Sequence, residues 1–430
     1  MYFTKLEWLW AQFRRQLIYR AIIIGLLAFM AALLGLMTDH LVPQNLALKV
    51  GADAVDSLLS IIASSMLAVT TFSLSTVVAA YGSATSTATP RATNLLLDDT
   101  VTQNMLATFI GAFIYSIAGI VLLKAGVYGT AGRLVLFAVT IFVIGLVVVM
   151  LVRWIDFLMH FGRLGNVLDR IEKAACKAME SMRTQPCLGG VAYEGDPARK
   201  PPGTDEVLSD DTGYVQFIDM EALSEAAGDD GEITVAAVPG SYVHRGSRLA
   251  YFKGGADEDI DGHIRSAFVV GSRRTFDQDP RLALITMSEV ASRALSPAVN
   301  DPGTAIEALA RHVRIFVSWL DAGEAAEPAY PNVRVPVTGF DDLFDDAFLA
   351  IGRDGAGHIE VVTRMMKSLA ALAECDAGRF AGQAKKHMQL LFDRAVVAMP
   401  DAADRSALIS VSEAAGLKLT AAQKKAAKAG

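Results

Sequence analysis

Four long stretches of the chain lack charged residues and consist mostly of apolar side chains. They cover residues 21–38, 57–90, 100–123 and 134–152. A helix of about 20 apolar residues crosses the hydrocarbon core of a bilayer, so each stretch can form most or all of a membrane span. The first has no small-residue cleavage site and is expected to remain as an anchor. The pattern therefore predicts four transmembrane helices within residues 21–153.

The second stretch is too long for a single crossing. Its 34 residues would extend about 51 Å as a helix, whereas the hydrocarbon core is about 30 Å thick. Small and hydroxylated side chains fall on one side of this helix. They are Ser57, Ser60, Ser64, Ala68, Thr71, Ser75 and Ala79. Such a face is typical either of a seam where helices pack closely or of the wall of a water-filled path.

A short break follows this long helix. Proline is tolerated in the first turn of a helix, so Pro90 is expected to start a short helix on the cytoplasmic side. Arg91 and the acidic pair Asp98 and Asp99 would then lie at the mouth of a path. Arg91 has a second interpretation as an arginine that reaches the membrane interface and anchors the span.

Basic residues predict the orientation of the spans. Four precede the first span within residues 5–20, and five follow the fourth within residues 153–177. The loop between the first two spans offers only Lys49. By the positive-inside rule, both termini are expected to be cytoplasmic. Cys176, Cys187 and Cys375 would then face a reducing compartment as free thiols.

The polar parts of the chain predict the remaining organisation. The expected fold is an α-helical membrane protein with four transmembrane helices and a cytosolic α+β domain that holds a small β-rich module and a helical bundle. The expected segments are a cytoplasmic N-terminal segment (1–20), the transmembrane domain (21–153), a membrane-exit helix (154–185), a linker (186–211), the β-rich module (212–272), a helical domain (273–415) and a frayed tail (416–430).

Short strands are expected in the β-rich module at residues 213–218 and 233–238, separated by a helix at 220–227. The spacing P-G-x-x-V-x-x-G-x-x-L from Pro239 resembles the corner of a biotinyl- or lipoyl-type barrel sandwich, but no Met-Lys-Met follows for covalent attachment of a cofactor. Residues 257–262 spell D-x-D-x-D-G. Phe268 stands where a calcium loop needs a bidentate Glu, so a helix start is expected instead of a metal site.

Two Asp-Pro pairs predict helix starts in the helical domain. Asp279 and Asp301 are expected to cap helices at residues 280–295 and 302–320, with the proline in the first position. A connector rich in polar residues surrounds them: Arg273, Arg274, Asp277, Asp279, Asn300 and Asp301. These side chains could form a polar pocket, but capping and turn formation explain them more simply. No catalytic triad, P-loop or dinucleotide-binding turn accompanies them, so an enzyme is not expected.

Composition supports a chain divided between membrane and water. Hydrophobic residues make up 52% of the 430 residues, and the mean hydropathy is +0.36. The formal charge of −7 argues against a nucleic-acid partner. Charged residues are absent from the interiors of the four spans, which disfavours a proton-coupled transporter. No cofactor or metal is expected. The expected partners are membrane lipids and other copies of the chain, with a small permeant ion in the case of a channel.

Several motifs together resemble one family. They are Pro90-Arg91, G-A-F-I-Y-S at residues 111–116, Gly213-Tyr214-Val215-Gln216, Arg274-Thr275, Gln278-Asp279-Pro280 and A-L-S-P-A-V-N-D-P-G-T-A at residues 294–305. With these motifs the chain resembles the bacterial predicted integral-membrane proteins called domain of unknown function twenty-two fifty-four. The resemblance implies four spans, a cytosolic domain and a place in the bacterial inner membrane. It implies no biochemical activity.

Two functions remain open at this point. The first is a homo-oligomeric channel in which the second span lines the path and the cytosolic domain forms a vestibule or gate. The second is a membrane-anchored sensor or scaffold that does not conduct and whose cytosolic domain binds a partner or small ligand. The hydroxylated face supports the first, and the size of the cytosolic part supports the second.

Overall fold

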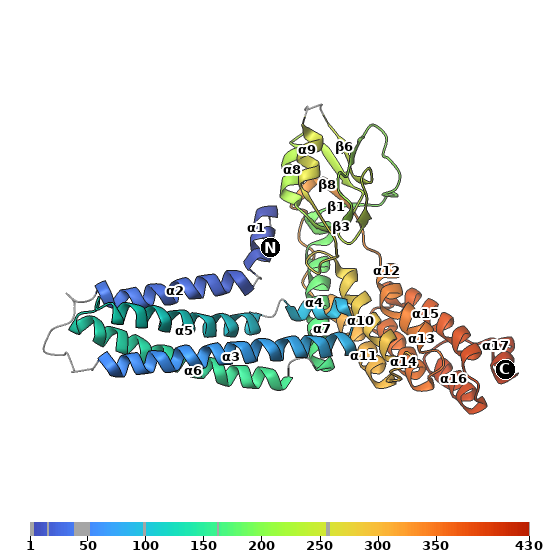
Figure 1. The fold of residues 1–430 in the computed structure, drawn as a ribbon. Helices are drawn as coiled ribbons and strands as arrows, with labels where there is room; N and C mark the ends of the chain where they lie inside the picture. Colours follow the sequence, from blue (N-terminus) through green and yellow to red (C-terminus); the bar gives the residue numbers. More distant parts are fainter. Residues whose placement is uncertain are drawn as a thin grey trace. The chain divides into compact units, whose positions relative to one another are not determined.

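The computed structural model describes residues 4–14, 17–37, 52–97, 100–160, 163–254 and 259–429. The chain forms two compact units (Figure 1). The first unit is Leu9–Val167, which holds the apolar helices. The second unit combines Met1–Trp8 with Leu168–Gly430 and holds the β-strands and the remaining helices.

The first unit is entirely helical in its described residues. Its elements are α1 (Lys5–Arg14, shared with the second unit), α2 (Leu17–Met37), α3 (Ala52–Thr87), α4 (Pro90–Leu97), α5 (Thr100–Lys124) and α6 (Thr130–His160). Three helices, α3, α5 and α6, are long and apolar enough to cross a membrane, and α1 with α2 would add a fourth span if this bent pair counts as one. The predicted short helix after Thr89 is confirmed as α4.

Glycines let the apolar helices pack closely against one another. Helices α2 and α5 run parallel, because Arg20 bonds Asn104 near their starts and the Tyr128 hydroxyl, just after α5, donates to the Ala32 carbonyl at 2.6 Å. A Cβ on Gly111 of α5 would lie 2.6 Å from a methyl group of Ile24, so only glycine fits there.

Helix α3 lies antiparallel to α5. Lys124 at the end of α5 lies 3.7 Å from Asp56 at the start of α3. One turn further along, Leu59 packs against Gly119, where a Cβ would approach its side chain to 3.0 Å. Helix α6 follows α5 in the opposite direction, and the buried Tyr115 hydroxyl bonds Thr140 at 3.0 Å. The helices therefore alternate in direction along the chain, as in an up-and-down bundle.

Two sheets form the β-containing part of the second unit. One has the order β1-β8-β4-β6-β2 and the other β5-β3-β7. The strands are β1 (Gly190–Tyr193), β2 (Asp205–Leu208), β3 (Gly213–Ile218), β4 (Glu232–Val235), β5 (Tyr242–Val243), β6 (Arg248–Lys253), β7 (Phe268–Gly271) and β8 (Tyr330–Pro336), with helices α8 (Met220–Ala227) and α9 (Ile260–Ser266). Buried apolar residues of β3, β4 and β6 pack with α8 in one core.

The sheet differs from the expected β-rich module in its extent. Residues 186–211, expected as a linker, contribute β1 and β2, and β8 comes from the expected helical domain. β8 pairs in parallel with β4 and β1. Parallel pairing requires a long crossover, which between β4 and β8 contains α9, α10 and α11. No local pattern in the sequence indicates which distant strand will complete the sheet.

Helices form the rest of the second unit. They are α7 (Leu164–Thr184, which begins in the first unit), α10 (Pro280–Ala294), α11 (Pro302–Asp321), α12 (Phe340–Phe344), a π-helical turn (Asp345–Leu349), α13 (Ala350–Asp354), α14 (Ile359–Cys375), α15 (Ala377–Ala398), α16 (Ala402–Ala414) and α17 (Ala421–Ala429). Buried phenylalanines, among them Phe316, Phe344 and Phe380, pack ring to ring between α11, α12 and α15.

The segment expected as a frayed tail contains a short helix. Residues 421–429 form α17, because alanine and lysine favour helix and Thr420 begins it with a capping box. The Gln423 side chain accepts from the Thr420 amide at 2.9 Å, and the Thr420 hydroxyl accepts from the Gln423 amide at 3.2 Å.

The N-terminal residues pack against the sheet-containing part of the same unit. Trp8 is 4% exposed and stacks on Phe217 of β3 with ring centroids 5.3 Å apart. Its indole N–H donates to Asp277 at 3.1 Å, and the Lys5 ammonium donates to the Ser266 carbonyl at 2.7 Å. The Lys5 amide also donates to the Asp219 carboxylate, so contacts at both Lys5 and Trp8 hold residues 5–8 on this part of the unit.

Candidate functional sites

The seven small and hydroxylated residues that the sequence places on one face of α3 lie on its exposed side. We call Ser57, Ser60, Ser64, Ala68, Thr71, Ser75 and Ala79 the hydroxyl stripe, and each is exposed in the single chain. At about 100° per residue they lie within about 60° of one direction, and Met66 points about 180° away. Val55, Leu59 and Met66, on that opposite side, are buried. The stripe thus faces away from the helices of its own chain.

Large apolar residues flank the stripe on both edges. Phe72 is 67% exposed on one edge, and Val78 is 62% exposed on the other. From Ser57 to Ala79 the stripe extends about 33 Å at 1.5 Å per residue, which matches the thickness of a hydrocarbon core. The exposed Ile61 lies in line with Ala79, so the exposed side of α3 is a band of mainly small and hydroxylated residues between two apolar margins.

The hydroxyl groups of the stripe donate to their own helix. Ser64 bonds the Ser60 carbonyl at 2.9 Å, Thr71 the Leu67 carbonyl at 2.9 Å, and Ser75 the Thr71 carbonyl at 3.0 Å. This bond from residue i to the carbonyl of i−4 uses the single hydroxyl proton, and the oxygen keeps lone pairs that can accept. The band consequently presents hydrogen-bond acceptors.

The expected mouth residues are placed only in part. The Thr89 hydroxyl accepts from the Ala92 amide at 3.3 Å, which caps α4 before Pro90. Arg91, in the first turn of α4, is exposed. Asp98 and Asp99 lie outside the described residues.

The connector residues near Asp279 form a tight local network. Asp279 is 2% exposed, and the Arg274 guanidinium donates to its two oxygens at 2.6 and 2.9 Å. The same carboxylate accepts from the Leu282 amide at 3.2 Å, which confirms Asp279 as the cap of α10. The backbone carbonyl of Arg273 accepts a hydrogen bond from the Gln216 side chain at 2.6 Å. The Asp277 carboxylate accepts one from the indole N–H of Trp8.

The other connector residues lie at the far end of α10. Asp301 caps α11 as expected, because its carboxylate accepts from the Thr304 amide at 3.1 Å and the Thr304 hydroxyl at 2.6 Å. Asn300 has a positive φ of 49° in the preceding turn, a conformation that asparagine tolerates. Because the 15 residues of α10 separate the two groups by about 22 Å along that helix, the six residues do not converge on one pocket.

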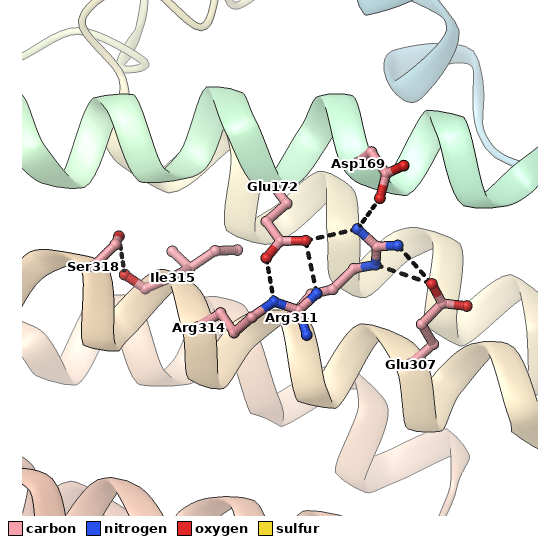
Figure 2. Close-up of polar contacts among 7 residues, drawn as sticks. All are labelled: Asp169, Glu172, Glu307, Arg311, Arg314, Ile315 and Ser318. Carbon is pink, nitrogen blue, oxygen red and sulfur yellow. Dashed lines mark hydrogen bonds and ion pairs between the residues drawn. The ribbon is translucent and has the colours of Figure 1, made fainter.

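An ion-pair cluster joins α7 to α11 (Figure 2). Arg311 is buried and donates to Asp169, Glu172 and Glu307, each at 2.6 Å. Arg314 donates to both oxygens of Glu172, from Nη2 at 2.8 Å to Oε2 and from Nε to Oε1. Two arginines of α11 thereby hold two acids of α7, the helix that follows α6.

The charges in this cluster stabilise one another. Burial alone would raise the pKa of Glu172, but the hydrogen bonds and charges of Arg314 and Arg311 hold it below its ordinary value. Burial opposes the charge of Arg311, and its bonds to Glu307 and Asp169 nevertheless raise its pKa. Removing one member would leave an opposing charge partly buried without its partner, which is costly.

Only the Glu307–Arg311 pair of this cluster could be predicted from the sequence. Glu307 and Arg311 are spaced i,i+4, which places them on one face of a helix. Asp169 and Glu172 lie about 140 residues earlier, and their spacing indicates only an acidic face on an amphipathic helix. Within the described ranges, no group of three His, Cys, Asp or Glu residues is arranged to hold a metal ion.

The apolar helices together with the sheet-containing unit define a helical membrane protein with an attached α+β region. The chain belongs to the family described as predicted membrane protein (DUF2254), whose model matches residues 14–371. This membership confirms the resemblance that its motifs indicate.

Curated relatives are uncharacterised proteins from Mycobacterium tuberculosis and Mycobacterium bovis. They are 26% identical to this chain over 299 residues, which cover 65% of this chain and 56% of each relative. The chain thus spans little more than half the length of these relatives. No solved structure matches the chain.

Proposed function

We propose that the protein is a homo-oligomeric membrane channel in which copies of α3 surround a hydrated path. The observation that carries this proposal is the hydroxyl stripe, which is exposed along the length of a bilayer core and lies opposite the side of α3 that packs within its own chain. A polar band of this kind is poorly matched to lipid, whereas a ring of such bands would enclose a polar interior.

A topology of four spans with both ends on the cytoplasmic side fits this arrangement. Residues 4–8 pack on the sheet-containing part of the second unit, so the chain before α2 and the chain after α6 belong on one side of the membrane. An even number of crossings follows from that condition. The parallel packing of α2 with α5 and the antiparallel packing of α3 with α5 agree with spans that alternate in direction.

The chemistry of the stripe favours water and small cations as the permeant species. Its hydroxyl protons are used within the helix, so the outward lone pairs can accept from water or coordinate a cation. The stripe has no charged member that would trap an ion. In this proposal the second unit forms a vestibule or gate.

Two threonines of α3 provide a matched test. Thr71 lies on the stripe and Thr76 lies about 140° away around the helix, and both donate to the carbonyl of residue i−4 at 2.9 Å. We expect Thr71→Leu to lower single-channel conductance of the purified protein in planar bilayers at least tenfold, because a bulky apolar side chain would enter the path. Thr76→Leu should leave conductance within about twofold.

Two results would contradict this expectation. One is equal conductance in Thr71→Leu and the parent protein. The other is the absence of any current from the parent protein across a range of voltage, membrane tension and ionic conditions.

The alternative is a membrane-anchored sensor or scaffold that does not conduct. It is favoured by the size of the second unit, which includes Leu168–Gly430. In that case the stripe would be a dry seam between chains, and Thr71→Leu would shift the oligomer toward monomers in detergent without a conductance to lose. Neither alternative assigns catalysis to the connector, in which Asp279 and Asp301 cap helices.

A further inference from the structure

A cleft of about 510 Å³ lies within the first unit, at the start of the membrane helices. Arg14 of α1, Tyr19 and Arg20 of α2, and Asn104 of α5 contribute its polar surface, and Ile23 and Ile24 contribute an apolar wall. Because α2 and α5 run parallel, these polar residues lie where both helices begin. The hydroxyl stripe belongs to another helix, so the cleft is separate from the proposed path.

The charge of the cleft suits an anion. Two of its lining residues are arginines, and the described lining residues include no aspartate or glutamate. Arg20 donates to the Asn104 side chain and to the Arg14 carbonyl, and these bonds hold its guanidinium at the cleft. A guanidinium has five N–H donors in a planar fork, so it can bind phosphate oxygens in addition to such partners.

The apolar part of the cleft indicates a ligand with hydrocarbon chains. Ile23 and Ile24 continue into the apolar residues of α2, which face lipid if that helix spans the membrane. Tyr19, which lines the cleft, also belongs to an aromatic cluster with Trp10 and Phe13, whose ring centroids lie 5.3 to 5.9 Å apart. Tryptophan and tyrosine concentrate at the interface between headgroups and hydrocarbon. A soluble anion would make no use of these surfaces.

We propose that this cleft binds the phosphate diester of an anionic phospholipid. The two arginines hold the phosphate, Tyr19 and Asn104 border the glycerol and headgroup, and the acyl chains lie along Ile23 and Ile24. The net positive charge of the lining favours an anionic lipid over a zwitterionic one. This site does not require the protein to conduct, so a failure of the channel proposal would leave it intact.

Native mass spectrometry of the full-length protein in detergent tests the site directly. We expect phosphatidylglycerol to remain bound at higher occupancy than phosphatidylcholine. The double variant Arg14→Gln, Arg20→Gln should weaken phosphatidylglycerol about 25-fold, because each arginine near a lipid surface is worth about fivefold. The matched control is Arg163→Gln, which removes an exposed arginine outside the cleft and should leave lipid binding unchanged.

Three outcomes would overturn the proposal. The first is equal retention of phosphatidylglycerol and phosphatidylcholine by the unmodified protein, a comparison that needs no variant to fold. The second is unchanged phosphatidylglycerol affinity in the double variant. The third is displacement of phosphatidylglycerol by inorganic phosphate in excess, which would identify a site for soluble phosphate instead.

Discussion

At the scale of single residues, His312 shows how burial sets the charge of a side chain. It lies on α11 with no exposed surface, and its ring meets Phe348 edge-on at a centroid distance of 5.7 Å. Removal from water disfavours the charged imidazolium and lowers the pKa of His312 to about 4. The folded protein therefore keeps this histidine neutral at pH values where an unfolded chain would protonate it.

Acidification should consequently lower the stability of the helices around His312. Between pH 6.5 and pH 4 the unfolded state binds a proton that the folded state does not, so stability falls as the pH falls through this window. The loss is about 2 kcal/mol at pH 5 relative to pH 8. Hydrogen–deuterium exchange of α10 and α11, corrected for the intrinsic pH dependence of exchange, should report it.

Substitution separates this histidine from the other titrating groups. His312→Phe should reduce the pH dependence in α11, whereas His244→Gln, which changes an exposed histidine of the sheet region, should retain it. If the helices lose protection equally in His312→Phe and in the parent protein, groups other than His312 carry the effect.

Sequence reasoning succeeds at this scale where one residue determines the local geometry. Asp279 and Asp301 could be assigned as caps because a carboxylate before proline satisfies amide groups within the next turn. The partners of Arg311 could not be assigned, because Asp169 and Glu172 meet it only through the packing of two distant helices.

At the scale of elements, the contacts of α1 with distant segments could likewise not be predicted from the sequence. The sequence predicts for α1 only a cytoplasmic N-terminal segment, and nothing in its residues indicates that Lys5 and Trp8 pack on the sheet region. The partners of these residues lie more than 200 positions later in the chain. Helix α3 was easier to predict, since its length and its stripe follow from the spacing of its own residues.

The contact of Trp8 with the sheet region can be tested with a neighbouring tryptophan. Trp8→Ala should remove a buried ring worth about 3 kcal/mol and increase hydrogen–deuterium exchange of residues 4–8 and of β3. Trp10→Ala changes a ring on the same helix that is 52% exposed, and it should leave exchange in β3 unchanged. Unaltered exchange in both variants would contradict the packing of residues 4–8 on the sheet.

At the scale of the whole molecule, the membrane class could be predicted because it depends on uncharged length, a local property. The course of the larger sheet could not, because β8 joins it only after a crossover through α10 and α11. Function depends on a still larger scale. One chain presents its hydroxyl stripe to its surroundings, and only the assembly of several copies would turn that stripe into the wall of a path.

Cysteine accessibility along α3 tests that central claim most directly. With Cys176, Cys187 and Cys375 replaced by serine, Thr71→Cys would be introduced in one protein and Met66→Cys, on the buried side of α3, in another. We expect a charged, membrane-impermeant thiol reagent to modify Thr71→Cys in the bilayer and reduce its current, and to leave Met66→Cys unmodified. A Thr71→Cys protein that stays unmodified and keeps its current would show that the stripe does not face a hydrated path.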